Sequence, residues 1–218
     1  MAGAALVAVL AGAALGIHSV VGGGSPRPSG AGGSAAVVRT GKACGVRVDD
    51  MRIVGSGGRT IYREPGDWTR GYPHPSVVRC SGSSVWVVWD NGAAMNQEGY
   101  VGVRSVDGGH TWHLVLADSF FGIKAPHEIG PDLGPWTLGG PRVAYFTSWC
   151  PVCSPDMPRA FVLWVTKNSG RTFRMYDVRG FGEYEPIRLR ISGATATLTA
   201  KGFIRGTQRR KTVTIHIA

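Results

Sequence analysis

Short apolar runs separated by turn residues occupy most of the chain after residue 22, and this pattern is typical of β-strands. Two segments align without a gap: PSVVRCSGSSVWVVWD from Pro75 and PIRLRISGATATLTAK from Pro186 share a proline, a first strand, a Ser-Gly turn and a second strand. A weaker copy begins at Pro131. No window after residue 22 has sustained helical periodicity. We therefore expect an all-β protein made of repeated antiparallel units.

The composition supports this interpretation. The 218 residues include 33 glycines and 13 prolines, which disfavours long helices and favours many turns. A hydrophobic content of 43% is enough for one core, so a single folded domain is expected.

The N-terminus differs from the rest of the chain. Residues 1–21 are apolar apart from His18 and carry no Lys, Arg, Asp or Glu, and residues 22–36 form a Gly/Ser/Pro-rich linker before a β domain over 37–218. Three interpretations remain open: a cleaved signal peptide, a retained N-terminal membrane anchor, and a disordered tail. The first two place the domain in an extracellular or cell-surface location.

Export makes the cysteines candidates for disulfides, with three connectivities. They are Cys44, Cys80, Cys150 and Cys153. We expect Cys150 to pair with Cys153 within one short loop, which leaves Cys44 for Cys80. The CPVC spacing also suits a redox pair, or a zinc site completed by His74 or His127, but neither a βαβ context nor a second close pair accompanies it. No metal or cofactor is expected.

One turn sequence occurs three times. SVDGGHTW spans Ser105 to Trp112, TKNSGRTF follows 61 residues later with Asn in place of Asp, and a degraded copy, VGSGGRTI, precedes it by 51 residues. The Asx side chain can accept hydrogen bonds from turn N–H groups, glycine can take the positive φ positions, and the final aromatic residue can enter the core. Each copy is therefore expected to be a structural turn.

SVDGGHTW matches the Ser-x-Asp-x-Gly-x-Thr-Trp pattern of the Asp box, or BNR repeat, and the chain thereby resembles sialidases and related β-propellers. The resemblance implies a structural role for Ser105, Asp107, Gly109, Thr111, Trp112, Thr166, Asn168, Gly170, Thr172 and Phe173. It also implies a small or incomplete β-propeller of about three to four blades, each box lying between the third and fourth strands. Full sialidase propellers have six blades, so the N-terminal strands close the ring or a second copy completes it as a homo-oligomer.

The same resemblance places a ligand face opposite the boxes, in loops expected at 63–74, 90–99, 121–130, 149–159 and 201–210. Its carboxylate candidates are Glu64, Asp67, Asp90, Glu98, Glu128 and Asp156, with Glu183 and Glu185 just before the last repeat. Trp68 and Trp149 are candidate sugar-stacking platforms, with core packing as the alternative.

A sialidase-like glycoside hydrolase would need three arginines to clamp a substrate carboxylate, a proton-transferring acid and a tyrosine nucleophile. The candidates for these roles are Arg79, Arg142 and Arg188, then Asp67 or Glu128, then Tyr184. The Arg-Ile-Pro signature that precedes the first box in catalytic members is missing. We therefore expect binding rather than catalysis, with the hydrolase and an assembly or scaffold propeller as alternatives.

Positive charge is concentrated near the C-terminus. Residues 167–218 carry eleven Lys or Arg against three acids. Arg209, Arg210 and Lys211 are the densest part, and we expect them to contribute to binding an anionic glycan, a wall polymer, a lipid head group or a protein, with an ordinary solvated surface as the alternative. No nucleic acid is expected, because no nucleic-acid-binding motif or interleaved aromatic residues are present.

Overall fold

A computed structural model describes residues 39–40, 44–49, 51–55, 57–63, 76–94, 97–118, 122–150, 160–181, 184–204 and 206–217. The chain divides into two units, Met1–Ser34 and Ala35–Ala218, and every described residue belongs to the second. The predicted leader and linker lie outside the described residues.

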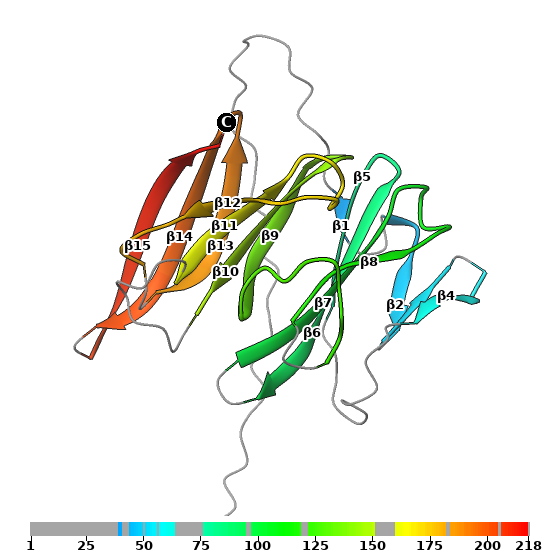
Figure 1. Ribbon diagram of the computed structural model, residues 1–218, viewed down its shortest axis with the longest axis horizontal. Helices are drawn as coiled ribbons and strands as arrows, with labels where there is room; N and C mark the ends of the chain where they lie inside the picture. Colours follow the sequence, from blue (N-terminus) through cyan, green and yellow to red (C-terminus); the bar gives the residue numbers. More distant parts are fainter. Residues whose placement is uncertain are drawn as a thin grey trace, which may run out of the picture. The chain divides into compact units, whose positions relative to one another are not determined.

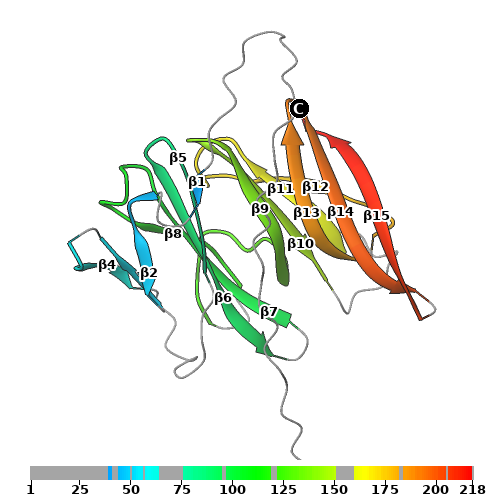
Figure 2. The ribbon, with the colours of Figure 1, turned by 180° about the vertical axis from the view of Figure 1, so that it is seen from behind.

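The described residues form four antiparallel sheets and no α-helix (Figure 1), which confirms the all-β prediction. The first sheet comprises β2 (Arg47–Asp49), β3 (Arg52–Val54) and β4 (Thr60–Arg63). The second comprises β1 (Arg39–Thr40), β5 (Ser76–Ser81), β6 (Ser84–Ala94), β7 (Gln97–Ser105) and β8 (His113–Ala117). The third comprises β9 (Asp132–Gly140), β10 (Val143–Trp149), β11 (Phe161–Thr166) and β12 (Arg174–Asp177). The fourth comprises β13 (Glu185–Ser192), β14 (Thr195–Ile204) and β15 (Thr207–His216), which run side by side in Figure 2.

The predicted repeats correspond to two hairpins, one in the second sheet and one in the fourth. β5 pairs with β6 and β13 pairs with β14, each around the aligned Ser-Gly turn. Gly82 and Gly193 occupy the same place in the two turns and share a left-handed backbone, with φ of 57° and 53°. Both repeats therefore use glycine for the same conformational reason.

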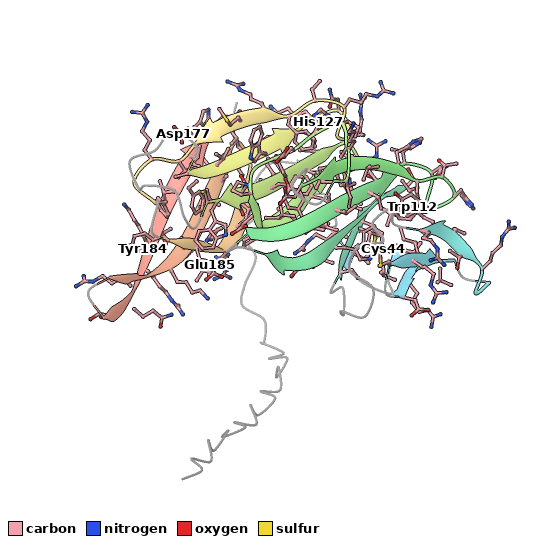
Figure 3. The ribbon with its side chains drawn as sticks, turned by 60° about the horizontal axis from the view of Figure 1, so that its bottom comes forward. Cys44, Trp112, His127, Asp177, Tyr184 and Glu185 are labelled. Carbon is pink, nitrogen blue, oxygen red and sulfur yellow. A yellow bond between two sulfur atoms is a disulfide. The ribbon has the colours of Figure 1, made fainter. Side chains whose placement is uncertain are left out.

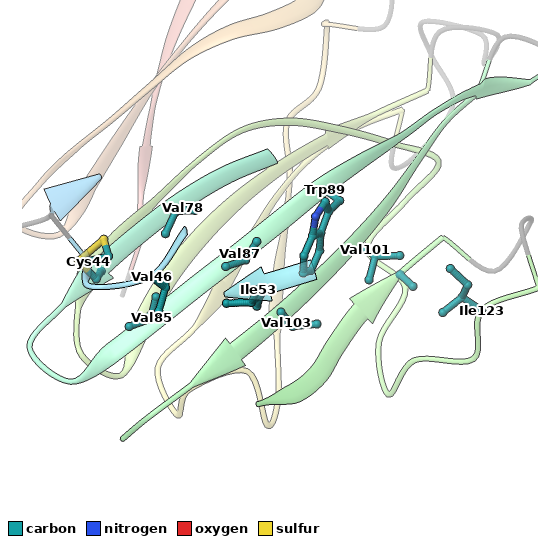
Figure 4. Close-up of a cluster of buried hydrophobic side chains, with 12 residues drawn as sticks. Cys44, Val46, Ile53, Val78, Val85, Val87, Trp89, Val101, Val103 and Ile123 are labelled. Carbon is teal, nitrogen blue, oxygen red and sulfur yellow. A yellow bond between two sulfur atoms is a disulfide. The ribbon is translucent and has the colours of Figure 1, made fainter. Parts of the chain in front are cut away.

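Three apolar clusters join adjacent sheets, and each cluster lies between sheets that follow one another in the sequence. The first joins β3 to β5, β6 and β7 through residues such as Ile53, Val87 and Val103 (Figure 4). The second joins the second sheet to the third, and the third joins the third sheet to the fourth. Along β6, Val87 and Trp89 enter the first cluster while Trp86 enters the second. Side chains alternate along a strand, so β6 is buried on both faces, as its continuous apolar sequence predicts.

The clusters of described residues connect neighbouring sheets only. None contains residues from both the first and the fourth sheets, and β1 pairs with β5 of the second sheet. The described residues therefore contain no closed ring.

Two segments predicted as loops are mostly strand. In 90–99, β6 continues to Ala94 and β7 begins at Gln97. The pairing of β6 with β7 shifts in register between Asp90 and Ala93, as at a β-bulge. In 201–210, β14 continues to Ile204 and β15 begins at Thr207. Gly206, at φ 76°, lets the chain reverse there within a few residues. Backbone pairing thus extends through segments whose composition is typical of loops.

Candidate functional site

The first box is a turn closed by its own side chains. Asp107 Oδ1 accepts hydrogen bonds from Ser105 Oγ at 2.6 Å, from the His110 backbone N at 3.1 Å and from the Thr111 backbone N at 2.9 Å. Thr111 Oγ1 donates to Asp107 Oδ2 at 2.6 Å. Ser105 Oγ also accepts from the Gly109 backbone N at 2.8 Å. The polar groups of the box are therefore occupied within the turn.

The second box repeats this network with an amide in place of the carboxylate. Thr166 Oγ1 donates to Asn168 Oδ1 at 3.1 Å and accepts from the Gly170 backbone N at 2.8 Å. The Thr172 backbone N donates to Asn168 Oδ1 at 3.0 Å. Asn168 Nδ2 donates to Thr172 Oγ1 at 2.8 Å, so the direction of this one bond is opposite to that in the first box. Both Asp and Asn can close the turn, because each has a short side chain with an oxygen that accepts hydrogen bonds.

These hydrogen bonds also set the protonation of Asp107. The hydroxyl of Ser105, followed by that of Thr111 and the Thr111 backbone N–H, holds the pKa of the Asp107 carboxyl well below its usual range. The carboxylate is ionised and fully used as an acceptor, which makes it unsuited to proton transfer. These hydrogen bonds suit the structural role predicted for Asp107 from the sequence.

Each complete box also packs against the preceding part of the chain. A Cβ on Gly109 would lie 2.9 Å from Val46 Cγ1, and a Cβ on Gly170 would lie 2.6 Å from Val115 Cγ1. Half-buried Trp112 packs against the first cluster, and its Nε1 donates to the Gly109 carbonyl at 2.9 Å. The box glycines are thus required by close approach between sheets as well as by positive φ.

The degraded copy keeps only part of this design. The Gly58 backbone N donates to the Gly55 carbonyl at 3.0 Å, and the Gly55 backbone N donates to the Arg59 carbonyl at 3.0 Å. It joins β3 to β4, as the complete boxes join β7 to β8 and β11 to β12. The turn before the last strand of the first sheet is therefore closed by backbone hydrogen bonds, whereas side chains close the corresponding turns of the second and third sheets.

A cleft of about 280 Å³ lies at the other end of the strands from the boxes. It is lined by Ser76, Val77, Arg79, Val88, Trp89, Asp90, Gly99, Tyr100, Leu133, Gly134, Pro135 and Trp136. The guanidinium of Arg79 lies 5.0 Å from the ring centroid of Trp136, a cation–π contact. Burial lowers the pKa of Arg79, and its Nε has no hydrogen-bond partner among the described residues.

Tyr100 and Trp136 are lining residues that sequence reasoning missed. The Tyr100 hydroxyl accepts from the Ile129 backbone N and donates to the Gly130 carbonyl, both at 2.9 Å. Burial raises the pKa of Tyr100, so this hydroxyl stays protonated and holds the connector that leads to β9. The only sequence signal for Trp136 is its place in the weak repeat that begins at Pro131.

The predicted arginine clamp is not assembled among the described residues. Arg79 lines the cleft, Arg142 lies in the turn between β9 and β10 near the boxes, and Arg188 lies on β13. The other predicted catalytic residues are also dispersed. Glu128 is exposed on the connector before β9. Asp67 and Trp68 lie outside the described residues.

Tyr184 and Glu185 are neighbours at the start of the fourth sheet (Figure 3). Glu185 Oε2 forms an ion pair with Lys201 Nζ at 2.9 Å, while the Tyr184 ring packs against Phe181. Trp149 is half-buried and packs against the third cluster, so the core alternative describes it better than a sugar platform.

The C-terminal charge is divided between the two faces of the fourth sheet. We define the basic face as the surface carrying Arg188, Arg190, Lys201 and Arg210, together with Thr197, Thr199, Thr212 and Thr214. In register, Arg188 lies beside Thr199 and Arg190 beside Thr197. Arg210 lies beside Lys201. Because the opposite face supplies Leu189, Leu198 and Val213 to the third cluster, the basic face points away from that cluster.

Alternation along β15 separates the three residues predicted to act together. Arg210 is on the basic face, whereas Arg209 and Lys211 point to the other side. Lys211 Nζ donates to the Gly180 carbonyl at 2.7 Å and lies 5.0 Å from the ring centroid of Phe181. Lys211 therefore ties β15 to the segment before β13, while Arg210 is exposed.

Cys44 and Cys80 form a disulfide, with Cα atoms 5.6 Å apart, which confirms that predicted pair. Cys150 also takes part in a disulfide, but Cys153 lies outside the described residues, so their pairing stays a prediction.

Within the described part of the chain, no group of three or more His, Cys, Asp or Glu side chains could hold a metal ion. The Cys44–Cys80 bond is compatible with an extracellular location. Among these residues, no helix has the length and apolar character needed to cross a membrane.

Comparison of the chain with family models, with curated proteins and with solved structures finds no match. The resemblance to Asp-box proteins therefore stays a prediction from the sequence motif.

Proposed function

We propose that the protein is an exported or membrane-anchored Asp-box protein with an incomplete β-propeller, and that it binds an extended anionic glycan or wall polymer on its basic face. The observation that carries this proposal is the composition of that face. Four basic side chains share it with rows of threonine hydroxyls, and among the described residues Glu185, beside Lys201 in register, forms an ion pair with Lys201.

The spacing of these groups suits a polymer with a repeating charge. Arg188 and Arg190 are two residues apart on one strand, which places their Cα atoms about 7 Å apart, and neighbouring strands are separated by about 4.8 Å. The threonines form cross-strand pairs, with Oγ1 atoms 3.5 Å apart for Thr197 and Thr214 and 3.2 Å apart for Thr199 and Thr212. Each hydroxyl can donate or accept, so a carboxylate or sulfate chain would find donors between the cations.

The polarity of this face also argues that no further sheet packs on it. Strands buried between two sheets are apolar on both faces, as β6 is, whereas β14 alternates threonine with buried Ala196, Leu198 and Ala200. If the four sheets are propeller blades, the fourth blade is then a terminal one with a solvent-facing surface. We infer that this surface is the one selected for binding.

The test uses heparin as a polyanion probe and neutral dextran as its comparison, with the exported domain measured at several salt concentrations. The variant replaces three arginines of the basic face with glutamine: Arg188, Arg190 and Arg210. We expect heparin affinity to fall by at least about tenfold, since charge-assisted contacts are lost. Binding by the parent should weaken steeply with salt, because exposed charges more than about 10 Å apart are screened near 0.1 M.

A matched control removes the same charge elsewhere, by changing the exposed side chains Arg59, Arg63 and Lys124 to glutamine. Equal losses in the two triple variants would show that only net charge matters and would refute a specific face. Lys211→Gln should instead lower the melting temperature, because its ammonium holds the Gly180 carbonyl.

A fluorogenic sialoside assay distinguishes the hydrolase. The separation of Arg79, Arg142 and Arg188 disfavours a substrate clamp, so we expect no turnover above the no-enzyme control. Turnover that one carboxylate substitution abolishes would replace the binding proposal with a sialidase-like enzyme. Absence of both turnover and salt-sensitive polymer binding would favour the scaffold.

A further inference from the structure

A second pocket, of about 310 Å³, lies at the box end of the second and third sheets. It is lined by Ser83, Ser84, Arg104, Val106, Pro141, Arg142, Asn168, Ser169 and Arg171. Three of these residues are arginines, and none is an acid. The pocket draws on the β5–β6 turn, the end of β7, the β9–β10 turn and the second box.

Arg104 is the buried member of this group. It alternates along β7 with Val103 and Ser105, so it shares the side of Tyr100, which faces the third sheet. Only 9% of Arg104 is exposed, and its Nε has no hydrogen-bond partner among the described residues. Ser84 is 1% exposed, and its Oγ is likewise without a partner there. Buried polar groups are normally satisfied, so the Nε of Arg104 and the Oγ of Ser84 are two polar groups at one pocket that a ligand could satisfy.

The other two arginines are exposed and held at the pocket through their backbones. The Arg142 carbonyl accepts from the Ser169 backbone N at 2.8 Å, and the Arg171 carbonyl lies 3.1 Å from His127 Nε2. Neither guanidinium forms an ion pair within the described part of the chain. Burial lowers the pKa of Arg104, and the positive charge of Arg171 lowers it further. Arg104 and Arg171 therefore repel each other, and no acidic side chain lines the pocket beside them.

We propose that this pocket binds a tetrahedral oxyanion, namely the phosphate or sulfate group of a small ester. Arg104 and Ser84 supply the buried donors, while Arg142 and Arg171 supply charge at the entrance. Guanidinium groups suit this chemistry because their planar N–H groups match phosphate and sulfate oxygens in pairs. The pocket has more room than a bare anion needs, so the sugar or polyol that carries the group fits beside it.

This inference does not depend on the proposed polymer binding. None of the pocket residues belongs to the basic face, and the fourth sheet does not line the pocket. Loss of heparin binding in the basic-face variant should leave the pocket unaffected, which separates failure of one proposal from failure of the other.

The test measures binding of inorganic phosphate and inorganic sulfate by calorimetry and by the shift in melting temperature, with chloride keeping ionic strength constant. The parent should bind at least one of the two anions at millimolar concentrations. Arg171→Gln and Arg142→Gln should each weaken binding by about tenfold, the loss expected for one charge-assisted contact. Ser84→Ala and Arg104→Met test the buried donors.

Arg59→Gln is the matched control, because Arg59 occupies in the degraded box the position that Arg171 occupies in the second box. It should bind the anions as the parent does. Absence of heat and of a melting shift with both anions would overturn the proposal, and so would an equal loss in the Arg59 and Arg171 variants. If Arg104→Met does not fold, the two exposed arginines still decide the outcome.

Two further binding measurements identify the organic group to which the phosphate is attached. Glucose 6-phosphate represents a sugar ester, and glycerol 1-phosphate represents a polyol ester of the kind found in head groups and wall polymers. Tighter binding of one ester than of inorganic phosphate would assign the carrier. Equal binding of all three would assign recognition to the anion alone.

Discussion

The box glycines provide the sharpest test of how these sheets are held together. Gly170 has φ 79°, and a Cβ built on it would lie 2.6 Å from Val115 Cγ1 and 3.0 Å from Trp86 Cη2. Trp86 is nearly fully buried in the second cluster, so it has little room to move. Gly170→Ala should therefore separate the second box from the second sheet.

Two costs contribute to the expected loss. A non-glycine residue in the left-handed region costs about 1 to 2 kcal/mol. An extra methyl group forced against a packed core costs about 1 to 3 kcal/mol more. We therefore expect Gly170→Ala to lower the free energy of unfolding by about 2 to 5 kcal/mol.

Gly108→Ala separates these two costs. Gly108 has nearly the same φ, 74°, but no atom lies within 4 Å of a Cβ built on it. Its counterpart in the second box is Ser169, a non-glycine residue at φ 65°. Gly108→Ala should thus show only the backbone cost, about 1 to 2 kcal/mol.

Urea unfolding of the two variants, with midpoints and slopes compared, measures this difference. Val115→Ala removes the methyl group that the new Cβ would meet, so it should be less destabilising in the Gly170→Ala background than in the parent. Equal losses in the Gly170 and Gly108 variants, with no coupling to Val115, would refute the packing argument.

Two other predictions concern the first box and the disulfide. The folded pKa of Asp107 is depressed, so its ionisation contributes stability above the unfolded value of about 4, and this contribution disappears as the pH falls below that value. Asp107→Asn, which copies Asn168, should keep the turn but flatten the acid side of a stability–pH curve, and an unchanged slope between about pH 5 and pH 2 would contradict this. Replacing Cys44 and Cys80 with alanine should lower the free energy of unfolding by about 4 kcal/mol, given a sequence separation of 36, and denaturant midpoints that match those of the oxidised parent would contradict the entropic argument.

The strand pattern and the boxes could be predicted because both are local. Alternation and turn glycines place β5 and β13 and the starts of β6 and β14 near their observed positions. The hydrogen bonds of a box join residues at most four positions apart. The Cys44–Cys80 pair follows by exclusion when the two CPVC cysteines are assigned to each other. Strands and turns that depend on residues close together in the sequence can be predicted from a single sequence.

The composite sites could not be predicted, because they depend on register between distant segments. Arg209, Arg210 and Lys211 are consecutive in sequence, yet a period of two sends them to different faces. Arg104 could have been noticed as a charge inside an apolar strand, but its neighbours in the pocket come from two turns and another box. Only the packing of one sheet on the next brings them together.

The same packing shows how a structural turn can support a binding site. Within a box, Asx, Thr and the first hydroxyl residue are used up by internal hydrogen bonds, and Gly is needed for close approach. The side chain between Gly and Thr forms none of these hydrogen bonds. This position holds Arg59, His110 and Arg171 in the three copies. In the second box, the residue at this position is Arg171, which lines a pocket together with Arg104 from the preceding sheet. A change of side chain at that position would leave the hydrogen bonds of the turn intact, so the box can keep its fold while the ligand chemistry at this position varies.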